Sequence, residues 1–194
     1  MGVYKLSGAG GLLTPRVNYT SMLAGNVAFV PSTYDLIETT ILGSAASSVT
    51  FSSLATYAST YKHLQVRMVT QGPGSVSMRF NGVTSSGSYK DHRLYGFNGA
   101  VSSDTITTGG MYLGAVSTTA SGVFSSKVIE ILDPFSSTKN KTIRTLSGRL
   151  SDAPFIIELV SGLFISTASV TSINIFGSSD MSVGSRFSLY GIKG

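Results

Sequence analysis

Hydrophobic and polar residues alternate in short runs along most of this chain. In one run, Leu64, Val66 and Met68 are separated by the polar residues Gln65 and Arg67. An alternation with a period of two is typical of a strand that buries one face and exposes the other. The pattern predicts strands at residues 34–42, 49–51, 61–69, 75–80, 111–116, 123–132, 141–150, 155–165, 170–176 and 186–192.

Turn-forming residues separate the predicted strands. Residues 71–74 (Gln-Gly-Pro-Gly) predict a hairpin turn between two of them. Phe-Asn-Gly occurs at residues 80–82 and again at 97–99, and Asn-Gly favours the positive φ angles of tight turns. Residues 52–59 predict at most one turn of helix. Short strands without a long helix predict an all-β fold, an antiparallel β-sandwich or jelly-roll-like domain.

Two of the predicted strands contain runs that are hydrophobic on both parities, at residues 128–132 and 155–160. Such runs are typical of central strands that are covered on both faces. They also fit strands that lie at a contact between subunits. The sequence leaves these two interpretations open.

Residues 1–33 show no sustained periodicity and contain several glycines and prolines. A disordered tail would hold fewer apolar residues, whereas an extended segment with apolar side chains can bind along another subunit. We therefore predict an extended N-terminal docking arm at residues 1–33 and a β-sandwich domain at residues 34–194. The alternative is a loop that covers the domain's own sheet. The residues expected to contact a partner are Leu12, Leu13, Val17, Tyr19, Met22, Leu23, Val27 and Phe29.

The composition favours a protein that buries part of its surface in an assembly. Charged residues make up 12% of the chain, against roughly 25% in an average soluble protein. Hydrophobic residues make up 42%. A soluble monomer normally covers itself with charged side chains, so a surface this poor in charge predicts partner subunits.

Other features argue against several classes of partner. The net charge is +5, but the basic residues are spread along the chain, so no nucleic-acid partner is expected. No apolar run approaches the ~20 residues of a membrane helix, and the first residues lack a secretory signal. The chain contains no Cys, which excludes disulfides and thiolate metal sites. We expect a soluble protein that is made in the cytoplasm.

No motif for catalysis or cofactor binding occurs in the chain. His63 and His92 are the only histidines. Asp91 precedes His92, but neighbouring residues of a strand point to opposite faces, so Asp91 is not expected to orient His92 as the acid of a catalytic triad does. We expect neither enzyme activity, nor a cofactor, nor a metal site.

Binding of a host-surface glycan is a further interpretation of the stretch around His92, which is rich in aromatic and polar residues. Aromatic rings stack on sugar faces, and the loops at the ends of a β-sandwich often carry binding sites. The residues of this predicted surface contact are Tyr89, Asp91, His92, Tyr95 and Asn98.

Several spaced segments resemble a β-rich module of tailed-bacteriophage virion proteins. The resemblance covers residues 35–194, and its segments follow one another in the order of that module. They are residues 61–67 (YKHLQVR), 78–82 (MRFNG), 92–96 (HRLYG), 129–133 (IEILD), 141–148 (KTIRTLSG) and 185–194 (SRFSLYGIKG).

This resemblance implies a structural protein of a tailed-phage virion, from a cyanophage or another aquatic phage. It supplies no catalytic residues. Long fibres of this kind have a shaft, whereas only a short arm precedes the domain here, which favours a compact piece on the tail, neck, baseplate or capsid.

Three functions follow as expectations. The first is a tail-, neck- or baseplate-associated fibre or adhesion protein, a homotrimer or other homo-oligomer that joins other virion proteins through its arm. The second is a capsid cement or decoration protein that ties capsomers together. The third, of another class, is a host-glycan-binding module.

Overall fold

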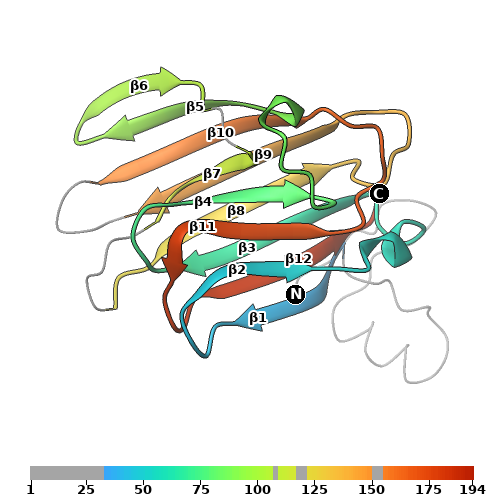
Figure 1. The fold of residues 1–194 in the computed structure, drawn as a ribbon, viewed down its shortest axis with the longest axis horizontal. Coiled ribbons are helices and arrows are strands. Elements are labelled where there is room, and N and C mark those ends of the chain that lie inside the picture. Colours follow the sequence, from blue (N-terminus) through green and yellow to red (C-terminus); the bar gives the residue numbers. More distant parts are fainter. Residues whose placement is uncertain (1–32, 107–108, 117–121, 150–154) are drawn as a thin grey trace, which may run out of the picture. The chain divides into compact units, whose positions relative to one another are not determined.

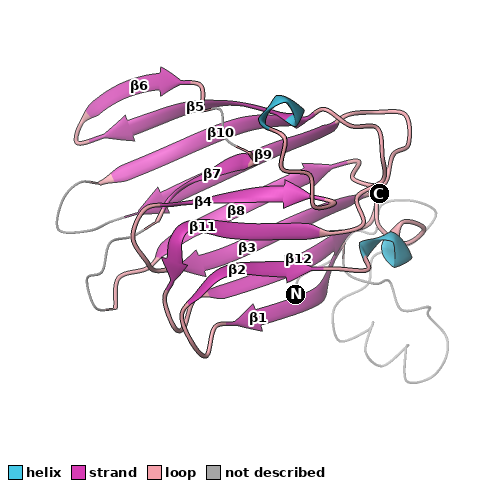
Figure 2. Ribbon diagram, in the orientation of Figure 1, coloured by secondary structure: helices cyan, strands magenta, loops and turns pink. Residues whose placement is uncertain are grey.

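The computed structural model describes residues 33–106, 109–116, 122–149 and 155–194. Residues from Tyr34 to Gly194 form one compact unit. The unit contains two antiparallel sheets packed face to face, which confirms the predicted all-β sandwich. Strands dominate it, and the helical segments are two short 3-10 turns, η1 (Leu54–Tyr57) and η2 (Ser86–Ser88) (Figure 2).

The larger sheet has eight strands, all paired antiparallel (Figure 1). A bulge between Leu36 and Glu38 shifts the register at its first edge. The central strands pair without a shift. In spatial order the strands are β1 (Tyr34–Ile41), β12 (Arg186–Ile192), β3 (His63–Thr70), β8 (Ser125–Leu132), β9 (Lys141–Arg149), β10 (Ile156–Phe164), β5 (Tyr89–Phe97) and β6 (Ala100–Asp104).

The smaller sheet covers only part of the larger one. It packs over the middle strands, and the β5–β6 hairpin extends beyond it (Figure 1). Its strands, in spatial order, are β2 (Ala46–Phe51), β11 (Ile173–Met181), β4 (Ser75–Phe80) and β7 (Met111–Ala115).

The hydrophobic core lies between the two sheets. Leu64, Val66 and Met68 of β3 are at most 2% exposed, as their alternation predicts. The smaller sheet contributes alternate residues in the same way, including Met78 of β4 and Ile175 of β11. Burial of such side chains contributes about 1.5–3 kcal/mol each and is the main force that holds the sheets together.

The sequence prediction differs from the structure in two places. Residues 71–74 do not form a hairpin, because β3 belongs to the larger sheet and β4 to the smaller one. The segment instead crosses between the layers, and Gly72 and Gly74 take positive φ angles there. The pattern also missed β5 and β6.

Both Phe-Asn-Gly segments form the tight turns expected of them. Asn81 and Gly82 have φ angles of 53° and 70°, and Asn98 and Gly99 have φ angles of 47° and 84°. In the second copy Phe97 pairs with Ala100, so Asn98 and Gly99 alone make the β5–β6 hairpin loop. Asn is among the few residues that tolerate this left-handed conformation.

The two asparagines differ in what their side chains bind. The Asn81 amide nitrogen donates to the carbonyl of Ser169 at 2.9 Å, and its oxygen accepts from the backbone N–H of Thr171 at 2.8 Å and of Ser172 at 3.3 Å. Asn98 accepts one bond, from the backbone N–H of Phe155 at 3.2 Å. Asn81 therefore fastens the β4 turn to the loop before β11.

We predict that Asn81→Ala lowers the free energy of unfolding more than the matched change Asn98→Ala. Both changes place alanine at a positive φ, but only the first removes several hydrogen bonds. The difference should be about 1–3 kcal/mol. Urea unfolding of the two variants measures it, and equal losses would show that the Asn81 bonds contribute nothing beyond the turn conformation.

Candidate functional site

A row of four exposed aliphatic side chains crosses the outer face of the larger sheet. Cross-strand pairing places Leu94 beside Leu159, Leu159 beside Leu146, and Leu146 beside Val128. These side chains of β5, β10, β9 and β8 are 49%, 52%, 55% and 38% exposed, respectively. Adjacent strands lie about 4.8 Å apart, so the four side chains form a continuous ridge. We call this the leucine row.

The next row along the strands is formed largely by small residues. Here Gly96 pairs with Ile157, Ile157 with Gly148, and Gly148 with Ser126. Only Ile157 projects as a large side chain, and it is 60% exposed. We call this the glycine row, and we call the two rows together the apolar face.

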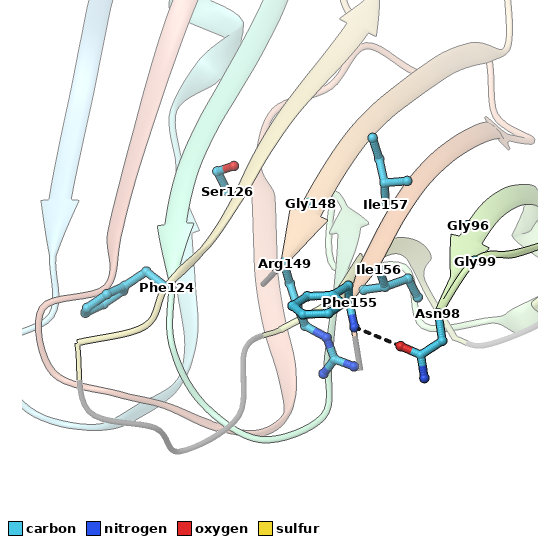
Figure 3. A pocket seen from close by; sticks show the side chains of 10 residues that line it. All are labelled: Gly96, Asn98, Gly99, Phe124, Ser126, Gly148, Arg149, Phe155, Ile156 and Ile157. Atoms are coloured by element: carbon cyan, nitrogen blue, oxygen red, sulfur yellow. Dashed lines mark hydrogen bonds between the residues drawn. The ribbon is translucent and has the colours of Figure 1, made fainter. Parts of the chain in front are cut away.

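A hollow of about 800 Å³ lies over the glycine row. Figure 3 shows Phe124 on one side of it and Phe155 with Asn98 on the other. The dashed line in that view is the bond from the Phe155 N–H to the Asn98 side chain. The residues that line the hollow are Gly96, Asn98, Gly99, Phe124, Ser126, Gly148, Arg149, Phe155, Ile156 and Ile157.

Polar residues border the leucine row on its other side. His92 pairs with Ser161, Ser161 with Arg144, and Arg144 with Glu130. The two rows of the apolar face contain no charged residue between β5 and β8. An uncharged patch of this size beside a polar border is typical of a site of protein association and not of ordinary solvent-exposed surface.

The structure does not gather the five predicted glycan-contact residues on one surface. Tyr89 is 1% exposed in the core, where its hydroxyl donates to the carbonyl of Val83 at 2.9 Å and accepts from the N–H of Phe80 at 3.1 Å. Asp91 is 8% exposed and also faces the smaller sheet. His92 is exposed on the opposite face.

The remaining two members of that set lie farther along the same hairpin. Tyr95 is half-buried, and the guanidinium of Arg93 lies 4.1 Å from the centre of its ring. Asn98 is exposed at the hairpin tip. Of the five residues, only Asn98 lines the hollow over the glycine row.

The side chains around His92 do not form a catalytic triad. His92 and Ser161 are cross-strand neighbours on the outer face. Asp91 points to the inner face, as the strand geometry predicts, and its carboxylate accepts the backbone N–H groups of Ile106 at 3.0 Å and Tyr112 at 3.1 Å. Burial raises the pKa of Asp91, and these two hydrogen bonds oppose the shift. Asp91 thus holds β7 against β5.

A charged network lies on the inner face of the same strands. Arg93 forms a bidentate pair with Asp104, at 3.0 and 2.6 Å, and donates to Glu158 at 2.8 Å. The Asp104 carboxylate raises the pKa of Arg93, and Arg93 in turn lowers that of Asp104. The Tyr112 hydroxyl donates to Glu158 at 3.0 Å, and burial followed by the Glu158 charge raises its pKa.

Lys127 is the second buried cation at this end of the sandwich. It is 2% exposed, and its ammonium donates to the carbonyl of Ala115 at 2.5 Å and to the Ser147 hydroxyl at 3.0 Å. Burial lowers its pKa to about 8, which nearby Arg149 assists and the Glu158 carboxylate opposes. A serine beside a lysine of lowered pKa is a pairing that can form a nucleophile. Ser147 is 1% exposed, and its hydroxyl lies within hydrogen-bond distance of Lys127 and Glu158.

The predicted docking arm lies outside the residues that the structure describes. The docking-arm residues lie outside: Leu12, Leu13, Val17, Tyr19, Met22, Leu23, Val27 and Phe29. Within the described ranges, no group of three or more His, Cys, Asp or Glu side chains is placed to hold a metal ion. No helix in that part of the chain has the length and apolar character needed to cross a membrane.

The leucine row was only partly visible in the sequence. The runs at residues 128–132 and 155–160 signalled apolar residues on both faces, and one of their two interpretations was a subunit contact. Leu94 was missed because β5 was not predicted. Leu146 was missed because its outward direction depends on the register, which the sequence does not show.

We predict that the free energy of unfolding rises with pH between pH 8 and pH 10. In the unfolded chain Lys127 regains a pKa near 10.5, so over this range the unfolded state binds more protons than the native state. The rise should reach up to about 2 kcal/mol. Above this range the raised pKa values of Tyr61, Tyr89 and Tyr112 act in the opposite direction.

Urea unfolding across this range measures the effect. Lys127→Met should make the rise smaller, and what remains comes from Lys141, whose pKa burial also lowers. Lys90→Met, which changes an exposed lysine of β5, should keep the full rise. Parallel curves for the native protein and Lys127→Met would show that Lys127 is not the titrating group.

Comparisons with protein-family models, with curated proteins and with solved structures each find no match.

Proposed function

We propose that this protein is a non-enzymatic structural component of a tailed-phage virion, most simply a short tail-, neck- or baseplate-associated fibre or adhesion protein. The observation that carries this proposal is the apolar face. Leu94, Leu159, Leu146 and Val128 project into solvent side by side on four central strands. A protein that functions alone would expose charged residues at the middle of a sheet.

Two further observations support the proposal. The chain as a whole contains few charged residues, 12% of the total, which suits a surface that other subunits cover. The segments that resemble phage virion modules include residues 92–96 and 141–148, which supply Leu94 and Leu146 of the leucine row.

The proposal does not assign a chemical step to any side chain. Asp91, Arg93, Tyr112 and Glu158 bind one another or the backbone of β7, so these groups join the two sheets. The arm at residues 1–33 would fasten the domain to a neighbouring virion protein, in keeping with its apolar residues.

We predict that the protein is present in purified virions and that its copy number identifies its location. Quantitative mass spectrometry against the major capsid protein measures this ratio. Tens of copies or fewer per particle are expected for a tail, neck or baseplate component. Hundreds of copies would replace this assignment with capsid cement, and absence from virions would contradict the proposed function as a whole.

We predict that deleting residues 1–33 leaves a folded domain that no longer joins the particle. Every described strand lies within residues 34–194, so circular dichroism and urea unfolding should show an intact sandwich. Particles assembled with the truncated protein should lack it, as electron microscopy with a labelled antibody would show. Normal incorporation would rule out the arm as the anchor.

A further inference from the structure

Gly148 occupies a position where the fold itself does not require glycine. It lies within β9, is paired on both sides, and does not have a positive φ angle. A Cβ built on Gly148 would meet no described atom within 4 Å. Glycine inside a strand lowers stability and often marks a place where another backbone or a ligand approaches closely.

The other strand glycines in the larger sheet face side chains of their own chain. A Cβ at Gly162 would overlap the Met111 thioether, and a Cβ at Gly191 would overlap the ring of Tyr61. Gly96 resembles Gly148 instead, because a Cβ there would meet only ordinary contacts, the nearest at 3.4 Å. Gly96 and Gly148 are thus the strand glycines of the larger sheet at which the described chain leaves room for a side chain. Both line the hollow on the apolar face.

Each of these glycines lies two residues after an exposed leucine on the same strand. Leu94 and Gly96 share the outer face of β5, and Leu146 and Gly148 share the outer face of β9. The spacing of two residues along a strand is about 7 Å. The same face therefore carries two projections and two matching depressions, with equal spacing on both strands.

We propose that the apolar face binds the apolar face of a second copy of this chain, with a two-fold axis that runs across the strands midway between the leucine row and the glycine row. This operation places Leu94 and Leu146 of each copy over Gly96 and Gly148 of the other. On β10, which lies between them, it places Leu159 against Ile157, an apolar contact between two exposed side chains. A two-fold contact must be self-complementary, and a patch with equally spaced projections and depressions meets this requirement.

The size and charge of the patch also suit a second copy. The exposed side chains of both rows continue into Val101 of β6, which is 77% exposed, so the apolar patch extends over five neighbouring strands. The leucine row and the glycine row contain no charged residue, so the side chains of these rows do not repel one another when two copies face each other. This pairing rests on the proposed function and names the partner at its assembly surface.

Sedimentation velocity of the full chain tests the pairing. The native protein should form a dimer at micromolar concentration. Leu146→Glu places a charge in the contact, and Gly148→Leu fills the depression from a Cβ that would meet no described atom within 4 Å. Each should raise the dissociation constant roughly 100-fold or more. The matched control Val183→Glu changes an aliphatic residue that is 57% exposed in the turn before β12, and it should leave the dimer intact.

Cross-linking tests the geometry. The chain contains no cysteine, so Leu146→Cys and Gly148→Cys variants each carry a single thiol. A short bismaleimide should join the two variants when they are mixed, more efficiently than it joins either variant to itself. Efficient linkage of Leu146→Cys to itself alone would overturn the proposed axis.

The outcomes separate this pairing from the proposed function. A monomeric native protein, or a dimer that both apolar-face variants leave intact, would overturn the pairing. If the same protein were still found in virions, the structural role would stand, and the apolar face would have to bind a different virion component. If Leu146→Glu failed to fold by circular dichroism, Gly148→Leu would decide the question.

Discussion

The structure depends on the unbroken antiparallel register of β8, β9, β10 and β5. These four strands pair residue for residue, without a bulge. Since successive side chains of a strand point to opposite faces, this register fixes both faces at once. A slip of one residue would bury Leu146 and Leu159 and bring Lys127 and Glu158 into solvent. The charged network inside and the leucine row outside are therefore two results of one pairing pattern.

The charged network explains why that register is held. Glu158 has a side chain with 0% exposure, and it binds Arg93, the Tyr112 hydroxyl and the N–H of Ala115 at 2.7 Å. A buried charge that loses its partner costs about 3–5 kcal/mol, so any slip of these strands would be severely destabilising. Replacing such a network by apolar residues is often neutral for stability, so its main effect is the penalty on a pairing that separates its members.

The backbone of β7 is shaped to fit the same network. Gly114 takes a φ angle of 115°, and a Cβ at this position would lie 2.5 Å from the Ser147 hydroxyl and 2.8 Å from the Glu158 carboxylate. The register between β4 and β7 shifts at Val76 and Ser77, next to the strand position of Gly114. The irregular strand of the smaller sheet thus brings its N–H and carbonyl groups to the buried charges of the larger one.

The sequence predicted the fold class and most strands because their inner residues are hydrophobic. It missed β5 because the inner residues there include Asp91 and Arg93, while Leu94 faces outward, so the usual alternation is inverted. The same inversion places Glu158 inside and Leu159 outside. Hydrophobicity alone identifies such a strand poorly, and it assigns the buried face to the wrong side. The cross-strand partners show which side chains point into the core.

Lys127 shows which features of a buried charge the sequence can predict and which it cannot. Lys127 shares its parity with Ile129 and Ile131, and that signal could have indicated an inward lysine. Its partners, the Ala115 carbonyl and the Ser147 hydroxyl, come from distant parts of the chain. No local pattern identifies them, since they depend on the packing of one sheet on the other.

The edge strands of the larger sheet carry features that oppose pairing with another sheet. Of the two edge strands of the larger sheet, β1 contains a bulge and the acidic residues Asp35 and Glu38, and β6 has only five residues and ends at Asp104. Bulges, charges and short length are the devices by which natural sheets prevent pairing between edges. The apolar face has none of these protections.

Gly148 is a second feature of the apolar face that lowers the stability of an isolated copy. A glycine within a strand costs roughly 0.5–1 kcal/mol relative to alanine and exposes backbone to water. A β-branched residue at this position would meet no described atom within 4 Å of its Cβ and would favour the strand. A chain optimised for its own stability would place one there. The depression at Gly148 is the feature that the proposed pairing of two copies would fill, and it is there that the pairing offsets the local cost of glycine.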